Sequence, residues 1–170
     1  MTEGAIAVDD PRAADVRELL GRHLTFARTH TPPEHVHALE LTGLLDPSVT
    51  FFSYRASGTL LGVGALKELD QRHGEVKSMH TAQEARGRGI GRAMLARLLA
   101  VARERGYLRV SLETGTMPAF AAARALYASA GFTACEPFGD YTVSPSNTWM
   151  TLSLSAIDPD AARVTSSICR

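Results

Sequence analysis

The chain has 170 residues, a length typical of one domain, and 45% of them are hydrophobic, which is enough to build a core. Its 18 basic and 18 acidic residues cancel, so the composition offers no overall charge that would attract nucleic acid or an anionic membrane. The N-terminus lacks a basic segment followed by a long apolar run, and Arg97 and other arginines interrupt the apolar stretches. We therefore expect neither a secretory signal nor a transmembrane helix. Cys135 and Cys169 are too few for a disulfide framework or a zinc site, which favours a cytoplasmic location.

The N-terminal part of the sequence predicts a short strand followed by two helices. Residues 5–8 suit a strand, and a helix follows with Asp10 expected as its N-cap and Pro11 at its first position. The apolar face of this helix repeats at helical spacing: Val16, Leu19, Leu20, His23, Leu24 and Ala27. A break with two prolines then precedes a second short helix, which we expect to end near Leu45.

The middle of the sequence predicts three strands and then a helix. Residues 49–69 indicate two strands around a turn at Ser57 and Gly58, and residues 74–81 indicate a third strand. The helix that follows should end near Gly106. Its apolar stripe consists of Ile90, Met94, Leu95, Leu98, Leu99 and Ala102.

The last part predicts a strand over 108–114, a helix opened by Pro118 and closed by Gly131, and two late strands, FTAC and NTWMTLSLS. The resulting order is β-α-α-β-β-β-α-β-α-β-β. Because hairpins come first and crossover helices later, the sheet must be mixed. We expect one α/β domain over residues 1–155 and a polar C-terminal tail over residues 156–170.

The stretch EARGRGIGRAML, residues 84–95, interleaves three glycines with three arginines directly before a predicted helix. These residues are Gly87, Gly89, Gly91, Arg86, Arg88 and Arg92. A helix N-terminus has unpaired N–H groups and a partial positive charge, and glycines before it let the backbone wrap closely around an anion. The stretch therefore suggests a phosphate-binding loop. The alternative is a tight strand-to-helix turn that needs glycine and binds nothing.

Two common phosphate motifs do not match this stretch. The Walker motif ends in Gly-Lys-Ser/Thr, whereas Gly91 is followed by Arg92 and Ala93. The Rossmann fingerprint, Gly-x-Gly-x-x-Gly, would have Arg92 or Met94 at its last glycine. What remains is Arg-x-x-Gly-x-Gly between a strand and an amphipathic helix.

This pattern resembles the phosphate loop of the GNAT superfamily of acyl-CoA-dependent N-acetyltransferases, which reads Gln/Arg-x-x-Gly-x-Gly/Ala and binds the pyrophosphate of coenzyme A. Downstream, ARALYASAGF (residues 123–132) resembles the family pattern of Leu-Tyr, three residues and Gly-Phe. The resemblance covers about residues 49–154. It implies a mixed, mostly antiparallel α/β (α+β) sheet of about six or seven strands flanked by four helices.

Three further stretches, GALKELDQRHGEVKSMHT, SLETG and PFGDY, resemble a bacterial branch described as indole-acetic-acid acetyltransferase-like. These motifs lie mainly on the side of the cofactor. The acceptor therefore stays open between a small amine, an amino acid, a peptide N-terminus, a lysine and an acid.

The resemblance implies a set of residues that bind acetyl-CoA. Backbone groups of Met79 and Thr81 would contact the pantetheine arm, and one N–H would polarise the thioester carbonyl. Arginines of the loop would add charge-assisted bonds to the phosphates. The implied set is Met79, His80, Thr81, Arg86, Gly87, Arg88, Gly89, Ile90, Gly91, Arg92 and Arg124. The sequence departs from the family at Phe120, where many members have an asparagine that contacts the coenzyme.

The resemblance also implies three catalytic residues. An attacking amine must lose a proton, and two carboxylates qualify as the base: Glu75 at the start of the strand before the loop, and Glu113 on the next strand. His80 is a third candidate, although strand alternation predicts that it faces away from Met79 and Thr81. Tyr127 is expected to protonate the thiolate of the departing coenzyme A.

The segment THTPPEHVHALEL is expected to form part of the acceptor pocket, with His37 orienting the acceptor and Tyr141 closing the pocket from the other end. His35 and His37 do not predict a metal site, because positions two apart do not face together on a helix and no third ligand lies near.

We therefore predict transfer of an acetyl group from acetyl-CoA to a primary amine of a small molecule or peptide, through a ternary complex. No metal, nucleic acid or membrane partner is expected, and a homodimer is compatible with the sequence. Two alternatives remain: a non-catalytic acyl-CoA-binding sensor of the same fold, and a different nucleotide-phosphate binder that uses the same loop.

Overall fold

A computed structural model describes residues 3–154, so the predicted tail over 156–170 lies outside the described residues, as does Cys169. The elements in chain order are β1 (Ala5–Val8), α1 (Ala14–His30), the 3-10 turn η1 (Pro33–His35), α2 (Leu41–Leu44), β2 (Val49–Ala56), β3 (Thr59–Asp70), β4 (His73–Thr81), η2 (Gln83–Ala85), α3 (Ile90–Glu104), β5 (Arg109–Gly115), η3 (Pro118–Phe120), α4 (Ala121–Ser129), β6 (Thr133–Cys135) and β7 (Asn147–Ser153). Apart from the short 3-10 turns, this is the predicted order.

The described strands form one sheet of seven, in the order β1-β2-β3-β4-β5-β7-β6. Every neighbouring pair is antiparallel except β4 and β5, which run parallel. A parallel pair needs a crossover connection, and α3 supplies it. The prediction of a mixed, mostly antiparallel sheet with four helices is therefore confirmed.

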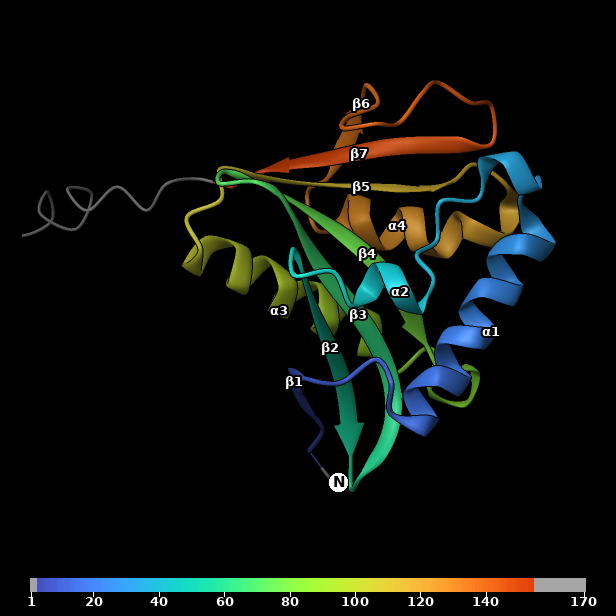
Figure 1. Cartoon of the computed structure of the whole chain (residues 1–170), viewed down its shortest axis with the longest axis vertical. Helices are drawn as coiled ribbons and strands as arrows, with labels where there is room; N and C mark the ends of the chain where they lie inside the picture. The colour runs from blue at the N-terminus through green and yellow to red at the C-terminus, as the bar shows by residue number, and fades with distance from the viewer. Residues whose placement is uncertain (1–2, 155–170) are drawn as a thin grey trace, which may run out of the picture.

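The parallel pair at the centre of the sheet separates along its length. β4 and β5 pair only from His73 with Arg109 to Val76 with Leu112. Beyond these residues the two strands diverge, as Figure 1 shows. A gap therefore opens in the middle of the sheet, between the C-terminal ends of two adjacent strands.

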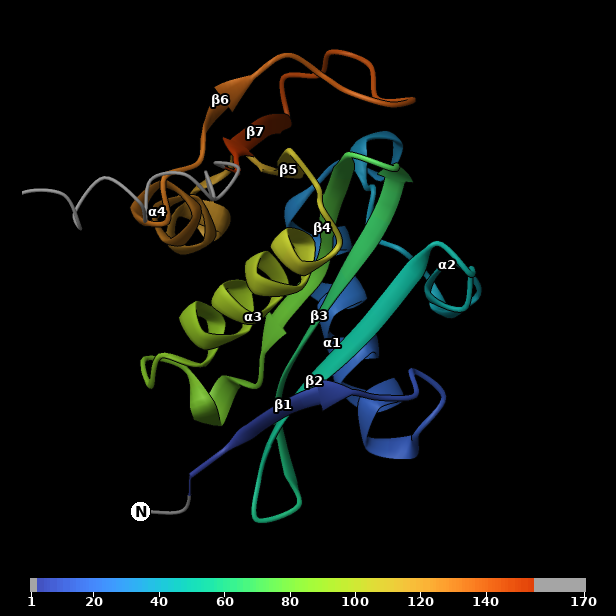
Figure 2. The ribbon, with the colours of Figure 1, turned by 90° about the vertical axis from the view of Figure 1, so that its left-hand side faces the viewer.

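The helices cover the two faces of the sheet in pairs, with α1 and α2 on one face and α3 and α4 on the other (Figure 2). Each face has its own buried cluster. The cluster under α3 and α4 includes Leu66, Val76, Met94, Leu95, Leu98, Val110, Leu112 and Tyr127. The cluster under α1 and α2 includes Val16, Leu19, Leu20, Leu44, Val63 and Ala65. Burying one such aliphatic side chain contributes roughly 1.5–3 kcal/mol, so both helix layers are firmly held against the strands.

Glycines in the left-handed conformation end the two helices of the second layer, as predicted. After α3, Gly106 has a φ of 78°, and the N–H of Tyr107 donates to the carbonyl of Ala102 at 3.0 Å. After α4, Gly131 has a φ of 97°, and the N–H of Phe132 donates to the carbonyl of Tyr127 at 3.1 Å. Both arrangements are Schellman motifs, which satisfy carbonyls at a helix end.

The predicted start of the first helix is wrong. α1 begins at Ala14, and Asp10 is not its N-cap. The Asp10 carboxylate instead accepts hydrogen bonds from the backbone N–H and the guanidinium of Arg12. These bonds hold residues 10–13 in a turn, so the helix starts about one turn later. No helix in the described part of the chain is long and apolar enough to cross a membrane.

Candidate active site

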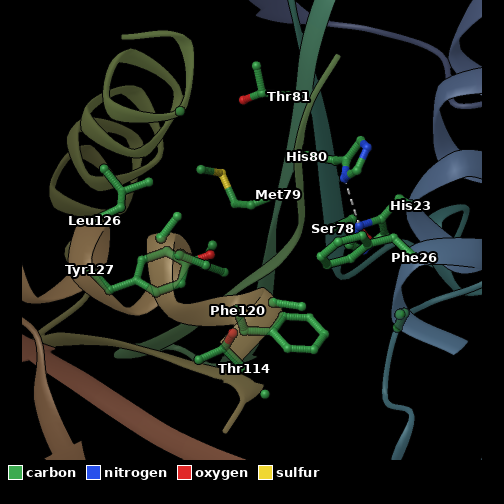
Figure 3. Close-up of a pocket in the computed structure, with 18 of the residues that line it drawn as sticks. His23, Phe26, Ser78, Met79, His80, Thr81, Thr114, Phe120, Leu126 and Tyr127 are labelled. Carbon is green, nitrogen blue, oxygen red and sulfur yellow. Dashed lines mark hydrogen bonds between the residues drawn. The ribbon is translucent and has the colours of Figure 1, made fainter. Parts of the chain in front are cut away.

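A cavity of about 720 Å³ occupies the gap between the ends of β4 and β5. Residues from both faces of the sheet line it. Figure 3 shows Met79, Leu126 and Tyr127 on the side of α3 and α4, and His23 with Phe26 on the side of α1. The cavity thus passes through the sheet, which allows two reactants to approach each other from opposite faces.

A β-bulge at Ser78 decides which side chains face each half of the cavity. Val63 pairs with His80 but Ala65 pairs with Lys77, so β4 contains one extra residue here. Ser78 adopts a φ of 55°, in the left-handed region. The bulge places Lys77 and His80 on the α1 face, while Met79 lies on the face of α3. His80 and Met79 therefore point to opposite sides, as strand alternation predicts (Figure 3).

The predicted phosphate loop forms one end of the cavity. Gly87 and Gly89 have φ values of 74° and 80°, and a Cβ placed on either would meet no atom within 4 Å. The first backbone bond into α3 runs from the N–H of Ala93 to the carbonyl of Gly89, so the N–H groups before it have no acceptor within the helix. An exposed glycine backbone at a helix N-terminus fits a phosphate group. Arg86 and Arg92 line the same end of the cavity.

Two arginines of the implied set lie outside the cavity lining. Arg88 is exposed, and Arg124 is engaged elsewhere. The Arg124 guanidinium donates to the carbonyls of Gly115 and Met117, at 2.7 and 3.0 Å. Arg124 therefore fastens α4 to the loop after β5, and a contact with the coenzyme stays a prediction.

The two candidate bases occupy different surroundings, and only Glu113 lines the cavity. Its Oε1 accepts a hydrogen bond from the amide of Asn147 at 2.5 Å. The same amide donates to the carbonyl of His35 at 2.9 Å, so its nitrogen is oriented by two acceptors. Burial raises the pKa of the Glu113 carboxyl above its ordinary value, although the bond from Asn147 opposes this shift.

Glu75 belongs to a buried network beneath the cavity. It is 3% exposed, and its Oε1 accepts a hydrogen bond from the hydroxyl of Tyr141. The ammonium of Lys77 lies 3.4 Å from the same oxygen and donates to the Tyr141 hydroxyl at 2.7 Å. Lys77 also donates to the carbonyl of His37 at 3.2 Å, and the rings of His37 and Tyr141 meet edge to face at 4.9 Å. Burial, followed by the Glu75 carboxylate, raises the pKa of the Tyr141 phenol.

Lys77 was not predicted as a site residue, although the sequence contains a signal for it. It is one of only two lysines in the chain, and it lies two residues after Glu75 in the strand that precedes the glycine-rich loop. Strand alternation places these opposite charges on the same face. Lys77 joins the segment that precedes α2 to the loop before β7, because its partners include both His37 and Tyr141.

Tyr127 points from α4 into the cavity (Figure 3). It is 7% exposed, and its ring packs on Phe132 with 5.9 Å between centroids. Burial, and then the nearby Glu113 carboxylate, raise the pKa of the phenol. The hydroxyl is therefore protonated at neutral pH and available as a proton donor.

An aromatic wall, formed by His23, Phe26, His80 and Phe120, closes the α1 side of the cavity. Helical periodicity predicts His23 on the apolar face of α1, but no local pattern links it to His80, because 57 residues separate them. The two Nδ1 atoms lie 3.3 Å apart. Burial lowers the pKa of both imidazoles to about 4, so both are uncharged at neutral pH.

Most of the predicted site residues thus meet around one cavity. Its lining includes Met79, His80, Thr81, Arg86, Gly87, Gly89, Ile90, Gly91, Arg92, Glu113, Tyr127 and His37. Glu75 and Tyr141 lie behind this lining, in the network of Lys77.

Comparisons with known proteins agree with this geometry. The model of the acetyltransferase (GNAT) family matches residues 13–132. An uncharacterized N-acetyltransferase of Bacillus subtilis (strain 168), YsnE, is 45% identical over 149 residues, which cover 88% of this chain and 99% of that protein. An IAA acetyltransferase of Azospirillum brasilense is 35% identical over 151 residues, which cover 88% of this chain and 97% of that protein.

Solved structures share the fold. A protein from Klebsiella pneumoniae subsp. pneumoniae matches with a TM-score of 0.77 at 27% identity, over 89% of this chain and 98% of that chain. A GNAT family acetyltransferase from Elizabethkingia anophelis with acetyl-CoA bound matches with a TM-score of 0.66 at 18% identity, over 89% of this chain and 98% of that chain.

Proposed function

The chain belongs to the GNAT family of acetyltransferases, and from this premise we propose that it transfers an acetyl group from acetyl-CoA to the primary amine of a small acceptor. The observation that carries this proposal is the cavity itself. At one end of this cavity lies the exposed backbone of Gly87 and Gly89, which fits a phosphate group. The carboxylate of Glu113 lines the same cavity and faces the other side of the sheet.

The loop before α3 would hold the coenzyme. Unpaired N–H groups at the helix N-terminus, with Arg86 and Arg92 beside them, would neutralise the pyrophosphate. Past Val76, the edge of β4 no longer pairs with β5, so its backbone groups are free to bind the pantetheine arm. The N–H of Met79 would donate to the thioester carbonyl oxygen and stabilise the negative charge that develops there.

Glu113 is the better candidate for the base that removes the proton of the amine. A protonated amine has no free electron pair, so it must lose a proton before its nitrogen attacks the acetyl carbon. Glu113 lines the cavity and has a raised pKa, which makes its carboxylate a stronger proton acceptor. Glu75 is already bonded to Tyr141 and Lys77 behind the lining, so it would position the acceptor side instead.

Tyr127 would complete the transfer. When the bond between the acetyl carbon and the sulfur breaks, the electron pair stays on sulfur, and the Tyr127 hydroxyl would supply the proton that makes coenzyme A a neutral thiol. The raised pKa of this phenol keeps the proton in place until that step.

A thiol-release assay tests the proposal. Purified protein with acetyl-CoA is challenged with a panel of small amines, peptides and indole-3-acetate, and a reaction without acceptor corrects for hydrolysis. Amine-dependent release of coenzyme A, with the acetylated amine identified by mass spectrometry, is the expected result. Calorimetric binding of acetyl-CoA without release for any acceptor would favour the non-catalytic sensor.

A further inference from the structure

The aromatic wall presents flat, apolar surface to the half of the cavity that faces α1. Phe26 on α1 meets Phe120 on η3 edge to face, with 5.3 Å between ring centroids. The ring of Phe26 also lies 6.4 Å from that of His80, which lies 5.1 Å from that of His23. Four rings from three separate elements therefore form one continuous surface that spans the gap between α1 and η3.

This surface carries no charge under ordinary conditions. Both imidazoles are neutral at pH 7, because burial lowers the pKa of each to about 4. The ammonium of Lys77, which also lines the cavity, is paired with Glu75. Glu113 is the acidic side chain in the lining, and Lys77, Arg86 and Arg92 are its cationic ones. Arg86 and Arg92 belong to the loop before α3, so the aromatic wall itself is uncharged and Glu113 is the carboxylate that an acceptor can meet.

The same half of the cavity has a fixed cover. Thr31 and residues 35–38 line it, and three hydrogen bonds tie this segment to other elements. Asn147 donates to the His35 carbonyl, Lys77 donates to the His37 carbonyl, and the His35 ring bonds to Ser146 Oγ at 2.8 Å. Because this segment is held at His35 and at His37, the cavity leaves room for a small molecule, and the segment opposes the entry of a folded polypeptide surface.

From these features, and resting on the proposed function, we infer that the acceptor is a small amine with an aromatic substituent. The substituent packs against Phe26 and Phe120, while the amine nitrogen faces Glu113. The wall selects the substituent through shape and desolvation, and Glu113 selects the amine through charge. A polyamine would have to bury further charges against the aromatic wall, which is costly without partners.

Matched acceptors test this inference. The comparison uses 2-phenylethylamine, n-butylamine, spermidine and a tetrapeptide of small residues with a free N-terminus, each at saturating acetyl-CoA. We expect kcat/KM for 2-phenylethylamine to exceed that for n-butylamine by about 30-fold, within the range that apolar pockets reach. Spermidine and the tetrapeptide should be poorer still. Equal values for the two monoamines, or a preference for the tetrapeptide, would overturn the inference.

Variants of the wall locate the preference. Phe26→Ala should reduce the preference for 2-phenylethylamine over n-butylamine at least tenfold, because the KM for the aromatic amine rises more than the KM for n-butylamine. Leu24→Ala is the control, because Leu24 lies on the same helix, is half-buried and does not line the cavity. If Phe26→Ala does not fold, Phe26→Leu replaces it and should still lower the preference. An unchanged preference in a folded Phe26 variant would refute the assignment of the wall.

The two proposals fail in different ways. Amine turnover without aromatic preference would refute only the inference about the acceptor. Binding of acetyl-CoA without turnover of any amine would refute the proposed function itself.

Discussion

Replacement of Glu113 by glutamine separates the two candidate bases. Glutamine keeps the size of the side chain and an oxygen that can accept the hydrogen bond from Asn147, which lies at 2.5 Å from Glu113. It removes only the capacity to take a proton. General base catalysis typically contributes 10²–10⁴-fold, so Glu113→Gln should lower kcat/KM by about that factor. Thermal stability and acetyl-CoA affinity should change little, because packing is retained.

The matched control, Glu75→Gln, should show the opposite pattern. Lys77 and Glu75 are 9% and 4% exposed at their side chains, so neutralising Glu75 leaves the buried ammonium without its charged partner. Breaking a buried ion pair typically costs about 3–5 kcal/mol, and we expect the lower end because Tyr141 and the His37 carbonyl still contact Lys77. This variant should therefore melt at a lower temperature, while kcat/KM of the folded protein falls less than about tenfold.

The pH dependence gives an independent measure. The base acts when deprotonated, so kcat/KM should fall as pH drops through the pKa of Glu113. Burial raises that pKa above the ordinary value of a glutamate carboxyl, so the acid limb should lie at a higher pH than for a free glutamate in the wild type and in Glu75→Gln, and disappear in Glu113→Gln. If Glu113→Gln keeps both the acid limb and near-wild-type kcat/KM, Glu113 is not the base. A large loss in Glu75→Gln at unchanged melting temperature would make Glu75 the base.

Three further changes test other parts of the site. Gly89→Val should weaken acetyl-CoA binding by more than about 2 kcal/mol in calorimetry, because its φ of 80° disfavours a branched side chain and the Cβ would occupy the open space of the loop. Tyr127→Phe should lower kcat by roughly 10²-fold with little change in melting temperature, whereas near-wild-type kcat would remove this phenol from the mechanism. The free energy of unfolding should decrease as pH falls from 6.5 to about 4. In this range His23 and His80 are protonated in the unfolded chain but uncharged in the folded protein, so protons favour the unfolded state. Each imidazole contributes at most about 3 kcal/mol to this loss, and denaturant titrations of His23→Leu should show a shallower dependence.

Periodicity predicted the elements well because each helix and strand owes its apolar pattern to the face it buries. The apolar stripe of α3 could be predicted because its residues recur at helical spacing and pack against one face of the sheet. The start of α1 was not readable in the same way. An aspartate before a proline is typical of a helix N-cap. The Asp10 carboxylate instead accepts hydrogen bonds from the backbone N–H and the guanidinium of Arg12. Residue preferences alone do not tell whether such a carboxylate binds the first turn of a helix or a neighbouring side chain.

The glycine-rich loop before α3 could be predicted because its signal is contained in a few consecutive residues. The acceptor side could not, because its contacts join distant parts of the chain. Asn147 holds the His35 carbonyl across 112 positions, and Tyr141 reaches Glu75 across 66. The resemblance implied acceptor roles for His37 and Tyr141, which stay predictions, and the network through Lys77 required the register of β4 against its neighbours.

That register depends on the bulge at Ser78, which links the two halves of the site. With regular alternation, Met79 and Thr81 would face the same side as Glu75 and Lys77. The extra residue reverses this order, so that Met79 and Thr81 face α3, where the coenzyme would bind, and His80 joins the wall on the α1 side. The arrangement has a cost, because Ser78 adopts a positive φ and its buried Oγ has no hydrogen-bond partner among the described residues. The strained residue, Ser78, lies where the cavity crosses the sheet. This position fits a strand that contacts two reactants, one on each face of the sheet.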